Sequence, residues 1–168
     1  MKKYEAVIAY IVNRFNQEGV KKTKIFKLLW FAHREFMYLY SKELSELKFI
    51  RLNYGPVPKL AKNNAQDTNK KHDRILEDMV RDGILKVSGG NYTCLKEPMN
   101  LSDTEIAVID QCLNAYGAMS AAQLSEVSHD RQWSALENGD IMLVEGVFAR
   151  DFLEIGDDEL ERMRAQYQ

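Results

Sequence analysis

The chain has 168 residues, of which 45% are hydrophobic and 29% are charged, a composition typical of globular proteins and unlike that of disordered or fibrous ones. One domain spanning residues 1–168 would bury an adequate core without disulfides or structural metals. The sequence at 2–5, KKYE, lacks the apolar core of a signal peptide, and no apolar run is long enough to cross a membrane. Cys94 and Cys112 lack metal-type spacing, which fits free thiols in a reducing compartment. We therefore expect a cytoplasmic protein with no membrane partner.

The charges are distributed unevenly along the chain. Residues 1–81 carry 17 Lys and Arg against 9 Asp and Glu, a net charge of +8, whereas residues 82–168 carry 6 against 16, a net charge of −10. One interpretation is that the two halves fold against each other and their charges largely cancel. The other is an oriented electrostatic field that attracts a charged partner.

Two helices are expected before residue 41. The first has apolar residues at helical spacing and ends at Gly19; its apolar positions are Tyr4, Ile8, Ile11, Val12 and Phe15. The second spans Thr23–Tyr40, with Thr23 as its N-cap. Because its apolar sector covers more than half of its circumference, we expect other elements to surround this helix.

The narrow polar side of the second helix carries an alternating stripe of cations and aromatic rings. It consists of Lys27, Phe31, Arg34 and Tyr38, at spacings of four, three and four residues. One interpretation is a solvated charged face with its two rings tucked against neighbouring loops. The other is a docking surface for a macromolecule, because aromatic residues and Arg are enriched in the cores of interfaces.

A rigid turn is expected after the second helix. Leu47–Leu52 reads as a short strand or extended segment that leads into this turn. The turn consists of Tyr54, Gly55, Pro56, Val57 and Pro58. Gly55 precedes a proline and is therefore pushed toward an extended or left-handed conformation. Pro58 suits the first turn of a helix running to about Asn64. Tyr54, at the corner, has either an architectural or a recognition role.

The middle of the chain predicts a helix followed by a β-hairpin. Residues 63–71 are polar and lack a period, so we expect a loop or a frayed helix end. A helix follows at Asp73–Asp82, with Gly83 as its C-cap. Strands at 84–87 and 92–95 then flank a Ser-Gly-Gly-Asn turn. This order is typical of winged helices. The expected helix, however, carries four carboxylates against two arginines, which disfavours DNA.

The rest of the chain reads as helices and one short apolar segment. Ser102 caps a helix that ends at Gly117, and Ser120 starts a short helix to about Ser128. We expect a strand or buried connector at 141–152. A charged helix is expected at 157–167.

Nothing in the sequence predicts catalysis, a metal or a cofactor. Ser128, His129 and Asp130 are adjacent, but the members of a catalytic triad normally come from separate elements. His33 lies within an apolar helical arc, as a core histidine does, and there is no Gly-rich phosphate loop. A hydrolase would lose its activity on His129→Ala with the fold intact. We expect the protein not to be an enzyme.

Four segments resemble the motifs of one family, the Panacea antitoxin domain, also described as phage-associated or SocA-like proteins. Thr23–Ala32 resembles its TKLxKLLYFA helix, and Tyr54–Val57 matches its YGP turn. Residues 76–84 resemble its helix ending in GLI, and residues 115–133 resemble its YG, LS, SH and W block. The resemblance departs from the commoner pattern at Arg51-Leu52-Asn53 and Lys42–Glu46, so the toxin specificity of relatives does not transfer.

The resemblance implies a non-enzymatic antitoxin that neutralises a cognate toxin by direct binding or acts as an adaptor that delivers the toxin to a protease. The alternative is a winged-helix-like DNA-binding regulator of a phage or toxin–antitoxin operon. We expect a mainly α fold with a minor β part: a compact helical domain around a central buried helix, with a small β-hairpin. Lys27, Phe31, Arg34 and Tyr38, together with the turn at 54–58, are the expected toxin contacts.

Overall fold

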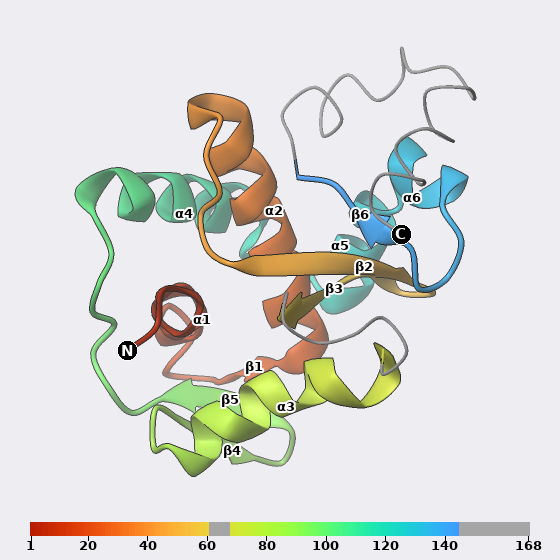
Figure 1. The fold of residues 1–168 in the computed structure, drawn as a ribbon. Helices are drawn as coiled ribbons and strands as arrows, with labels where there is room; N and C mark the ends of the chain where they lie inside the picture. The colour runs from red at the N-terminus through yellow and green to blue at the C-terminus, as the bar shows by residue number, and fades with distance from the viewer. Residues whose placement is uncertain (61–67, 145–168) are drawn as a thin grey trace.

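The computed structural model describes residues 1–60 and 68–144, and of residues 68–73 the backbone alone (Figure 1). Within these ranges it contains six helices: α1 Lys3–Asn13, α2 Lys22–Tyr40, α3 Thr68–Arg81, α4 Asp103–Tyr116, α5 Ala121–Ser128 and α6 Arg131–Ala135. The strands are β1 Val20–Lys21, β2 Leu47–Leu52, β3 Gly55–Leu60, β4 Leu85–Ser88, β5 Asn91–Cys94 and β6 Ile141–Met142. Helices form about half of the chain, so the fold is mixed α+β and its β part is larger than the single hairpin expected.

Helix α2 runs through the middle of the molecule, as its apolar sequence predicted (Figure 1). It packs against α1, α4 and α5 and against strand β3. The helix begins at Lys22, so the prediction of Thr23 as N-cap was wrong: strand β1 leads directly into α2, and Lys21, still extended, holds the cap position. The C-terminal end is formed by Ser41, whose left-handed backbone (φ +54°) lets its N–H donate to Met37 O.

The first sheet has the order β1-β5-β4 and lies beside α3 (Figure 1). Its β4–β5 hairpin confirms the prediction, with Gly89 and Gly90 forming a two-residue turn in which both φ angles are positive. Helix α3 begins at Thr68, so the expected loop is helical at 68–71, and its earlier part lies outside the described residues. Strand β1 adds to the hairpin through Val20 opposite Tyr92, which completes a winged-helix-like sheet.

The second sheet, of order β3-β2-β6, corrects one prediction. Pro58 does not start a helix: it lies in strand β3, opposite Phe49 of β2. Pro56 and Pro58 are two residues apart, so their missing N–H groups face the same side of an edge strand. Strand β3 is an edge strand with β2 as its neighbour in this sheet, and a proline is tolerated on such a strand where its nitrogen faces away from the neighbour.

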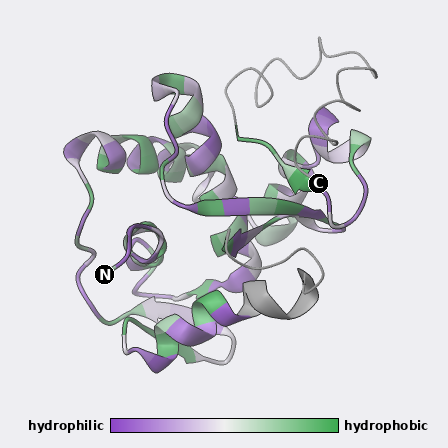
Figure 2. Cartoon of the chain, viewed as in Figure 1, coloured by the Kyte–Doolittle hydropathy of each residue, from purple (hydrophilic) through white to green (hydrophobic). Residues whose placement is uncertain are grey.

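The elements after the first sheet follow their local signals. Ser102 and Ser120 each cap a helix through a capping box, as predicted, and Gly117 ends α4. Hydrophobic and hydrophilic residues both occur along α4 (Figure 2). The expected strand at 141–152 is confirmed at Ile141–Met142, while residues 145–168, with the expected terminal helix, lie outside the described residues. Among the helices that are described, none is both long and apolar enough to cross a bilayer.

Candidate functional site

The β2–β3 hairpin presents one aromatic side chain at its tip. Leu52 pairs with Gly55, so the turn consists of Asn53 and Tyr54 alone. Tyr54 is 77% exposed, the largest value among the exposed large hydrophobic residues of the described chain. The prediction that Tyr54 occupies the corner of the turn is confirmed.

Three elements are in close contact at Gly55, directly beside the turn of this hairpin. Gly55 has φ +113°, and a Cβ atom there would lie 2.3 Å from Ser128 Oγ and 2.7 Å from Lys27 Cε. Lys27 comes from α2 and Ser128 from the end of α5, so a side chain at position 55 would collide with the side chains of both. The buried Lys27 Nζ donates a hydrogen bond to Pro56 O at 3.0 Å. Burial lowers the pKa of Lys27 from 10.5 to about 8.

The segment 129–138 braces the tip from the other side. Trp133 Nε1–H donates to Leu52 O at 2.8 Å, and Arg51 Nε–H donates to Trp133 O at 3.1 Å. The Arg51 guanidinium lies 3.8 Å from the centre of the Trp133 ring, and the ring of His129 stacks on Trp133 at 3.7 Å. Asn138 Nδ2–H donates to Asn53 Oδ1 at 2.8 Å. These contacts hold the turn in one position while Tyr54 stays in solvent.

The stripe on α2 is largely inside the protein, which corrects the expectation of a polar, solvated face. Lys27 and Phe31 are each only 1% exposed. The reason is that β3 covers Lys27 and α4 covers Phe31, whose ring stacks on Tyr116 with centroids 4.4 Å apart. Arg34 is half-buried and pairs with Asp130 at 3.5 Å, whereas Tyr38 is 41% exposed. The interpretation that tucked the rings inward is correct for Phe31.

The turn residues other than Tyr54 are also inside. Gly55, Pro56, Val57 and Pro58 are all buried. They position Tyr54 and seal α2, so among the predicted contacts Tyr54, Tyr38 and part of Arg34 are accessible to a partner.

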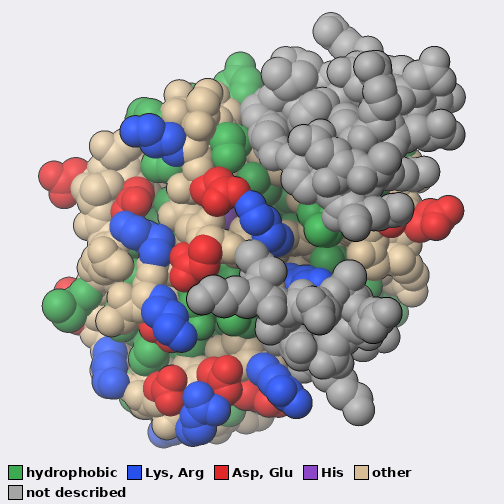
Figure 3. Space-filling model, in the orientation of Figure 1, with side chains coloured by type: hydrophobic (Ala, Val, Ile, Leu, Met, Phe, Trp, Pro, Cys, Tyr) green, Lys and Arg blue, Asp and Glu red, His purple; other side chains and the backbone are tan. Residues whose placement is uncertain are grey.

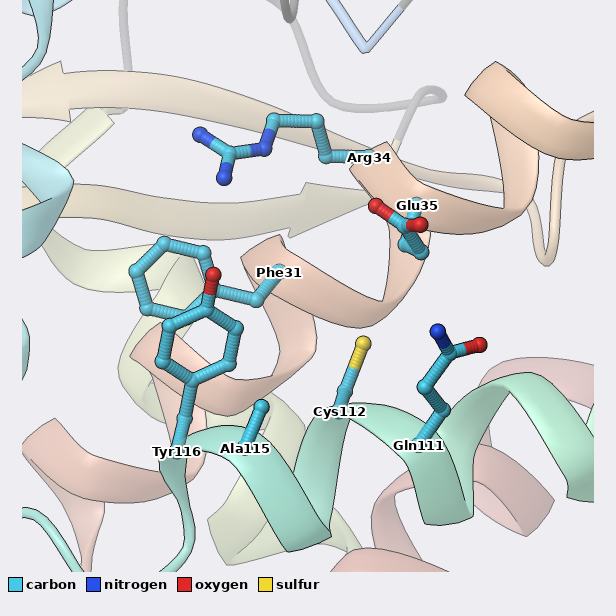
Figure 4. Close-up of a pocket in the computed structure, with 7 residues that line it drawn as sticks. All are labelled: Phe31, Arg34, Glu35, Gln111, Cys112, Ala115 and Tyr116. Atoms are coloured by element: carbon cyan, nitrogen blue, oxygen red, sulfur yellow. The ribbon is translucent and has the colours of Figure 1, made fainter.

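A pocket opens where the stripe reaches the surface between α2 and α4 (Figure 4). Its volume is about 150 Å³, and it is lined by Phe31, Arg34, Glu35, Gln111, Cys112, Ala115 and Tyr116. The rings of Phe31 and Tyr116 form one wall, and the thiol of Cys112 points toward the cavity from α4 (Figure 4). Burial first, and Glu35 second, raise the pKa of Cys112 to about 12, so the group is a neutral thiol.

Three of the four motif segments named above therefore meet in space. Residues of 23–32, 54–57 and 124–133 come together around Gly55 and Trp133. A family model, described as the antitoxin SocA-like, Panacea domain, matches residues 25–134, more than half of the chain. The chain belongs to the Panacea family. No curated protein matches the chain, and neither does any solved structure.

In this Panacea chain the adjacent Ser128, His129 and Asp130 have separate structural tasks. Ser128 Oγ donates to Ser125 O, and Asp130 Oδ1 accepts the Trp133 N–H as the N-cap of α6. Nε2 of His129 is buried and has no hydrogen-bond partner within the described residues. The three side chains thus do not form a relay. Across residues 1–60 and 74–144, whose side chains the structure describes, no group of three or more His, Cys, Asp or Glu could hold a metal ion.

His33 is a core residue of this Panacea domain, as predicted. Its Nδ1–H donates to Leu29 O at 2.8 Å, and Nε2 accepts from Ser45 Oγ at 2.6 Å. Leu29 O can only accept, which fixes this tautomer. Burial lowers the pKa of His33 to about 4, so the ring is neutral at neutral pH.

Sequence reasoning missed Arg51 and Asn138 as bracing residues and the whole pocket. Trp133 was noticed only as part of a motif, and His129 was considered for catalysis but not for packing on Trp133. No local signal could have found the Arg51–Trp133 contact, because the two residues are 82 positions apart.

Proposed function

We propose that this chain is the antitoxin of a toxin–antitoxin pair and neutralises its toxin by direct binding. The family match supports the toxin–antitoxin role. The observation that supports direct binding is the high exposure of Tyr54, an aromatic residue on a turn that is held rigid from two sides. A rigid, exposed tyrosine loses little conformational entropy on binding, which is the property of an interface anchor.

The binding face runs from Tyr54 to the α2–α4 pocket. Arg51 and Trp133 lie beside the turn of the hairpin, and Asp130, the N-cap of α6, pairs with Arg34 at the edge of the pocket. This chain of contacts connects the tip to the pocket. An exposed anchor and a nearby concavity are features of protein-binding surfaces.

Co-expression with the neighbouring reading frame, followed by a growth assay and pull-down, tests the proposal. Tyr54→Ala should weaken the complex by about 30-fold or more, the effect of an interface anchor, and leave the melting temperature unchanged. Met99→Ala, which truncates a side chain that is 67% exposed beyond the β4–β5 hairpin, is the matched control and should bind as wild type does. Full rescue of growth by Tyr54→Ala would rule out this face. Phe31→Ala is no test of binding, because it opens a cavity in the core.

Masking and proteolytic delivery of the toxin differ in one observable. If the antitoxin acts as an adaptor, the half-life of the toxin in cells falls when the antitoxin is present and recovers when the protease is removed. If it masks the toxin, the toxin accumulates in a stable complex.

A DNA-binding regulator is the second candidate, and the arrangement of α3 with the sheet β1-β5-β4 favours it. The described surface of α3 argues against it, because Arg81 is paired with Asp78 and Asp82 and Glu77 is exposed. Acidic and basic side chains lie side by side over this region (Figure 3). This role would be established if the protein bound the promoter DNA of its own operon with an affinity that falls steeply as the salt concentration rises.

A further inference from the structure

We infer that Arg51, beside the turn of the β2–β3 hairpin, binds the carboxylate of an aspartate or glutamate side chain of the toxin. This inference rests on the proposed function, because it names the chemistry of one contact on the face that presents Tyr54. In Figure 1, α6 and the segment after it lie beside the end of this hairpin. Arg51 is half-buried and only three positions from Tyr54 along the chain, so a toxin segment that packs on Tyr54 passes within reach of Arg51.

The guanidinium of Arg51 is held in one position before a partner arrives. Its Cζ atom lies 3.8 Å from the centre of the Trp133 ring, and its Nε–H donates to Trp133 O at 3.1 Å. Its Nη1 donates to Oδ1 of Asn138. Because little side-chain freedom remains to be lost, the entropic cost of binding a partner through Arg51 is small.

Within the described residues, no carboxylate compensates the positive charge of Arg51. Its two acceptors, the backbone carbonyl of Trp133 and the side-chain amide of Asn138, are both neutral. By contrast, each of three other arginines pairs with an aspartate: Arg14, Arg34 and Arg81. A half-buried guanidinium without a counter-charge is stabilised by an anion that binds to it.

One nitrogen of the Arg51 guanidinium is open to a partner. Nη2 donates to no acceptor in the part of the chain that the structure describes. The side-chain atoms found there to be both buried and unpaired are Trp30 Nε1 and His129 Nε2, so Nη2 of Arg51 reaches solvent. Both of its N–H groups are therefore available, and a carboxylate offers two oxygens that accept such charge-assisted hydrogen bonds.

The electrostatic field around Arg51 also favours an anion. Burial first, and then the charges of Lys27 and Arg51, lower the pKa of the His129 ring. Asp130 and Glu126 act on this ring in the opposite direction, and their effects are smaller. The two cations thus dominate the potential at this place, which attracts a carboxylate and repels a lysine or arginine of the toxin.

Calorimetric titration of the full chain with the toxin measures the contribution of Arg51. Arg51→Gln should weaken the complex about tenfold or more, as the loss of a charge-assisted hydrogen bond does. Arg51→Lys should weaken it less, because lysine keeps the charge but not the planar guanidinium. The affinity of wild type should also fall more steeply with salt than that of Arg51→Gln. Arg74→Gln, which removes the charge of an exposed arginine on α3, is the matched control and should bind as wild type does.

Asn138→Asp separates the charge of Arg51 from its part in holding the turn. The new carboxylate would pair with Arg51 from within the protein, so the melting temperature should not fall, while the toxin should bind about tenfold more weakly. Asn138→Ala removes the amide without adding a charge and should weaken binding less. In cells, Arg51→Glu should fail to rescue growth, and a toxin variant with lysine or arginine in place of one acidic residue should restore the rescue.

The outcomes separate this inference from the proposed function. If wild type binds the toxin and Arg51→Gln binds as tightly as Arg74→Gln, the inference fails while the antitoxin role stands. Equal losses of affinity in Asn138→Asp and Asn138→Ala would show that Arg51 acts only by holding the turn, and would also overturn it. If wild type binds promoter DNA and Arg51→Gln does not, Arg51 contacts a phosphate instead. If wild type forms no complex with the toxin, the antitoxin role and this contact both fail for that pair.

Discussion

The molecule contains two β-hairpins with two-residue turns, and they are built in opposite ways. The strands β2 and β3 are mostly buried, whereas seven of the eight residues of β4 and β5, all but Leu85, are half-buried or exposed. Each turn region receives a hydrogen bond from a lysine. Lys27 Nζ donates to Pro56 O inside the protein, and Lys21 Nζ donates to Gly89 O at 2.8 Å in solvent.

The comparison shows that glycine is needed in the two hairpins for different physical reasons. Gly55 is required by the neighbours that press on it, Ser128 and Lys27. Gly89 has nothing within 4 Å of its Cβ position, so it serves only the positive φ angle of its turn. The first hairpin is held by the rest of the protein, and the second is held by its own turn chemistry.

The largest effect is expected at Gly55, beside the turn of the first hairpin. Gly55→Ala should lower the free energy of unfolding by about 3 kcal/mol or more, because it combines a left-handed backbone with a Cβ atom 2.3 Å from Ser128 Oγ. Urea unfolding measures this difference. A loss below about 1 kcal/mol would mean that α5 moves away easily and that the hairpin is not braced as described.

The contributions of Lys27 and Lys21 to the stability of the fold should depend differently on pH. The pKa of Lys27 falls to about 8 in the folded state from 10.5, so between these values the unfolded chain binds more protons than the folded one. Stability from this group therefore rises with pH between about 8 and 10.5, by about 3 kcal/mol in total.

Unfolding curves of wild type, Lys27→Met and Lys21→Met across this pH range test the difference. The difference in free energy of unfolding between wild type and Lys27→Met should change by about 3 kcal/mol over this pH range. The stability of Lys21→Met should follow that of wild type. Subtracting the curves removes the opposite trend from Cys112, whose raised pKa makes the fold less stable above pH 9. Parallel curves for all three proteins would show that Lys27 is solvated.

A moderate effect is expected from the brace at the tip. Trp133→Phe removes the hydrogen bond to Leu52 O and shrinks the ring on which Arg51 lies. We expect a loss of about 1–2 kcal/mol in stability, together with weaker toxin binding through a looser Tyr54. Thermal unfolding and calorimetric titration measure the two effects. Unchanged stability would show that the turn holds its shape without this brace.

The smallest effect is expected in the second hairpin. Gly89→Ala should cost about 1 kcal/mol, the strain of placing alanine at φ +56°, because its Cβ atom would meet no neighbour. Toxin binding should not change. If Gly89→Ala proved as damaging as Gly55→Ala in the same unfolding assay, the two hairpins would not differ in the way the structure indicates.

The parts of the fold that depend on neighbours in sequence were predictable. The capping boxes at Ser102 and Ser120 and the Gly89-Gly90 turn are local chemistry. Helix α1 was also predicted, but it ends at Asn13 rather than at Gly19, and its residues from Tyr4 to Ala9 are all buried, so it is not amphipathic as expected. Helix α6 was missed because it has only five residues and is capped by Asp130, which was considered for catalysis instead.

The site was less predictable because its geometry depends on distant partners. Pro56 and Pro58 signal the start of a helix as readily as an edge strand, and only pairing with β2 decides between them. The α2 stripe gave no sign that α4 would cover Phe31. Tyr54 was located correctly because glycine and proline fix the turn whatever surrounds it. Its exposure, however, depends on packing.

The amide of Gln132 has a consequence for how this protein can recognise a partner. This buried side chain pairs with both backbone groups of Leu143, donating to Leu143 O and accepting from its N–H, so it occupies the place where a further strand would bind beyond β6. On the opposite edge, Pro56 and Pro58 offer no N–H, and Lys27 already occupies Pro56 O. Within the described residues, both margins of the β3-β2-β6 sheet are therefore closed to strand addition. A partner must therefore bind this surface through side-chain contacts, and specificity there depends on Tyr54 and its neighbours.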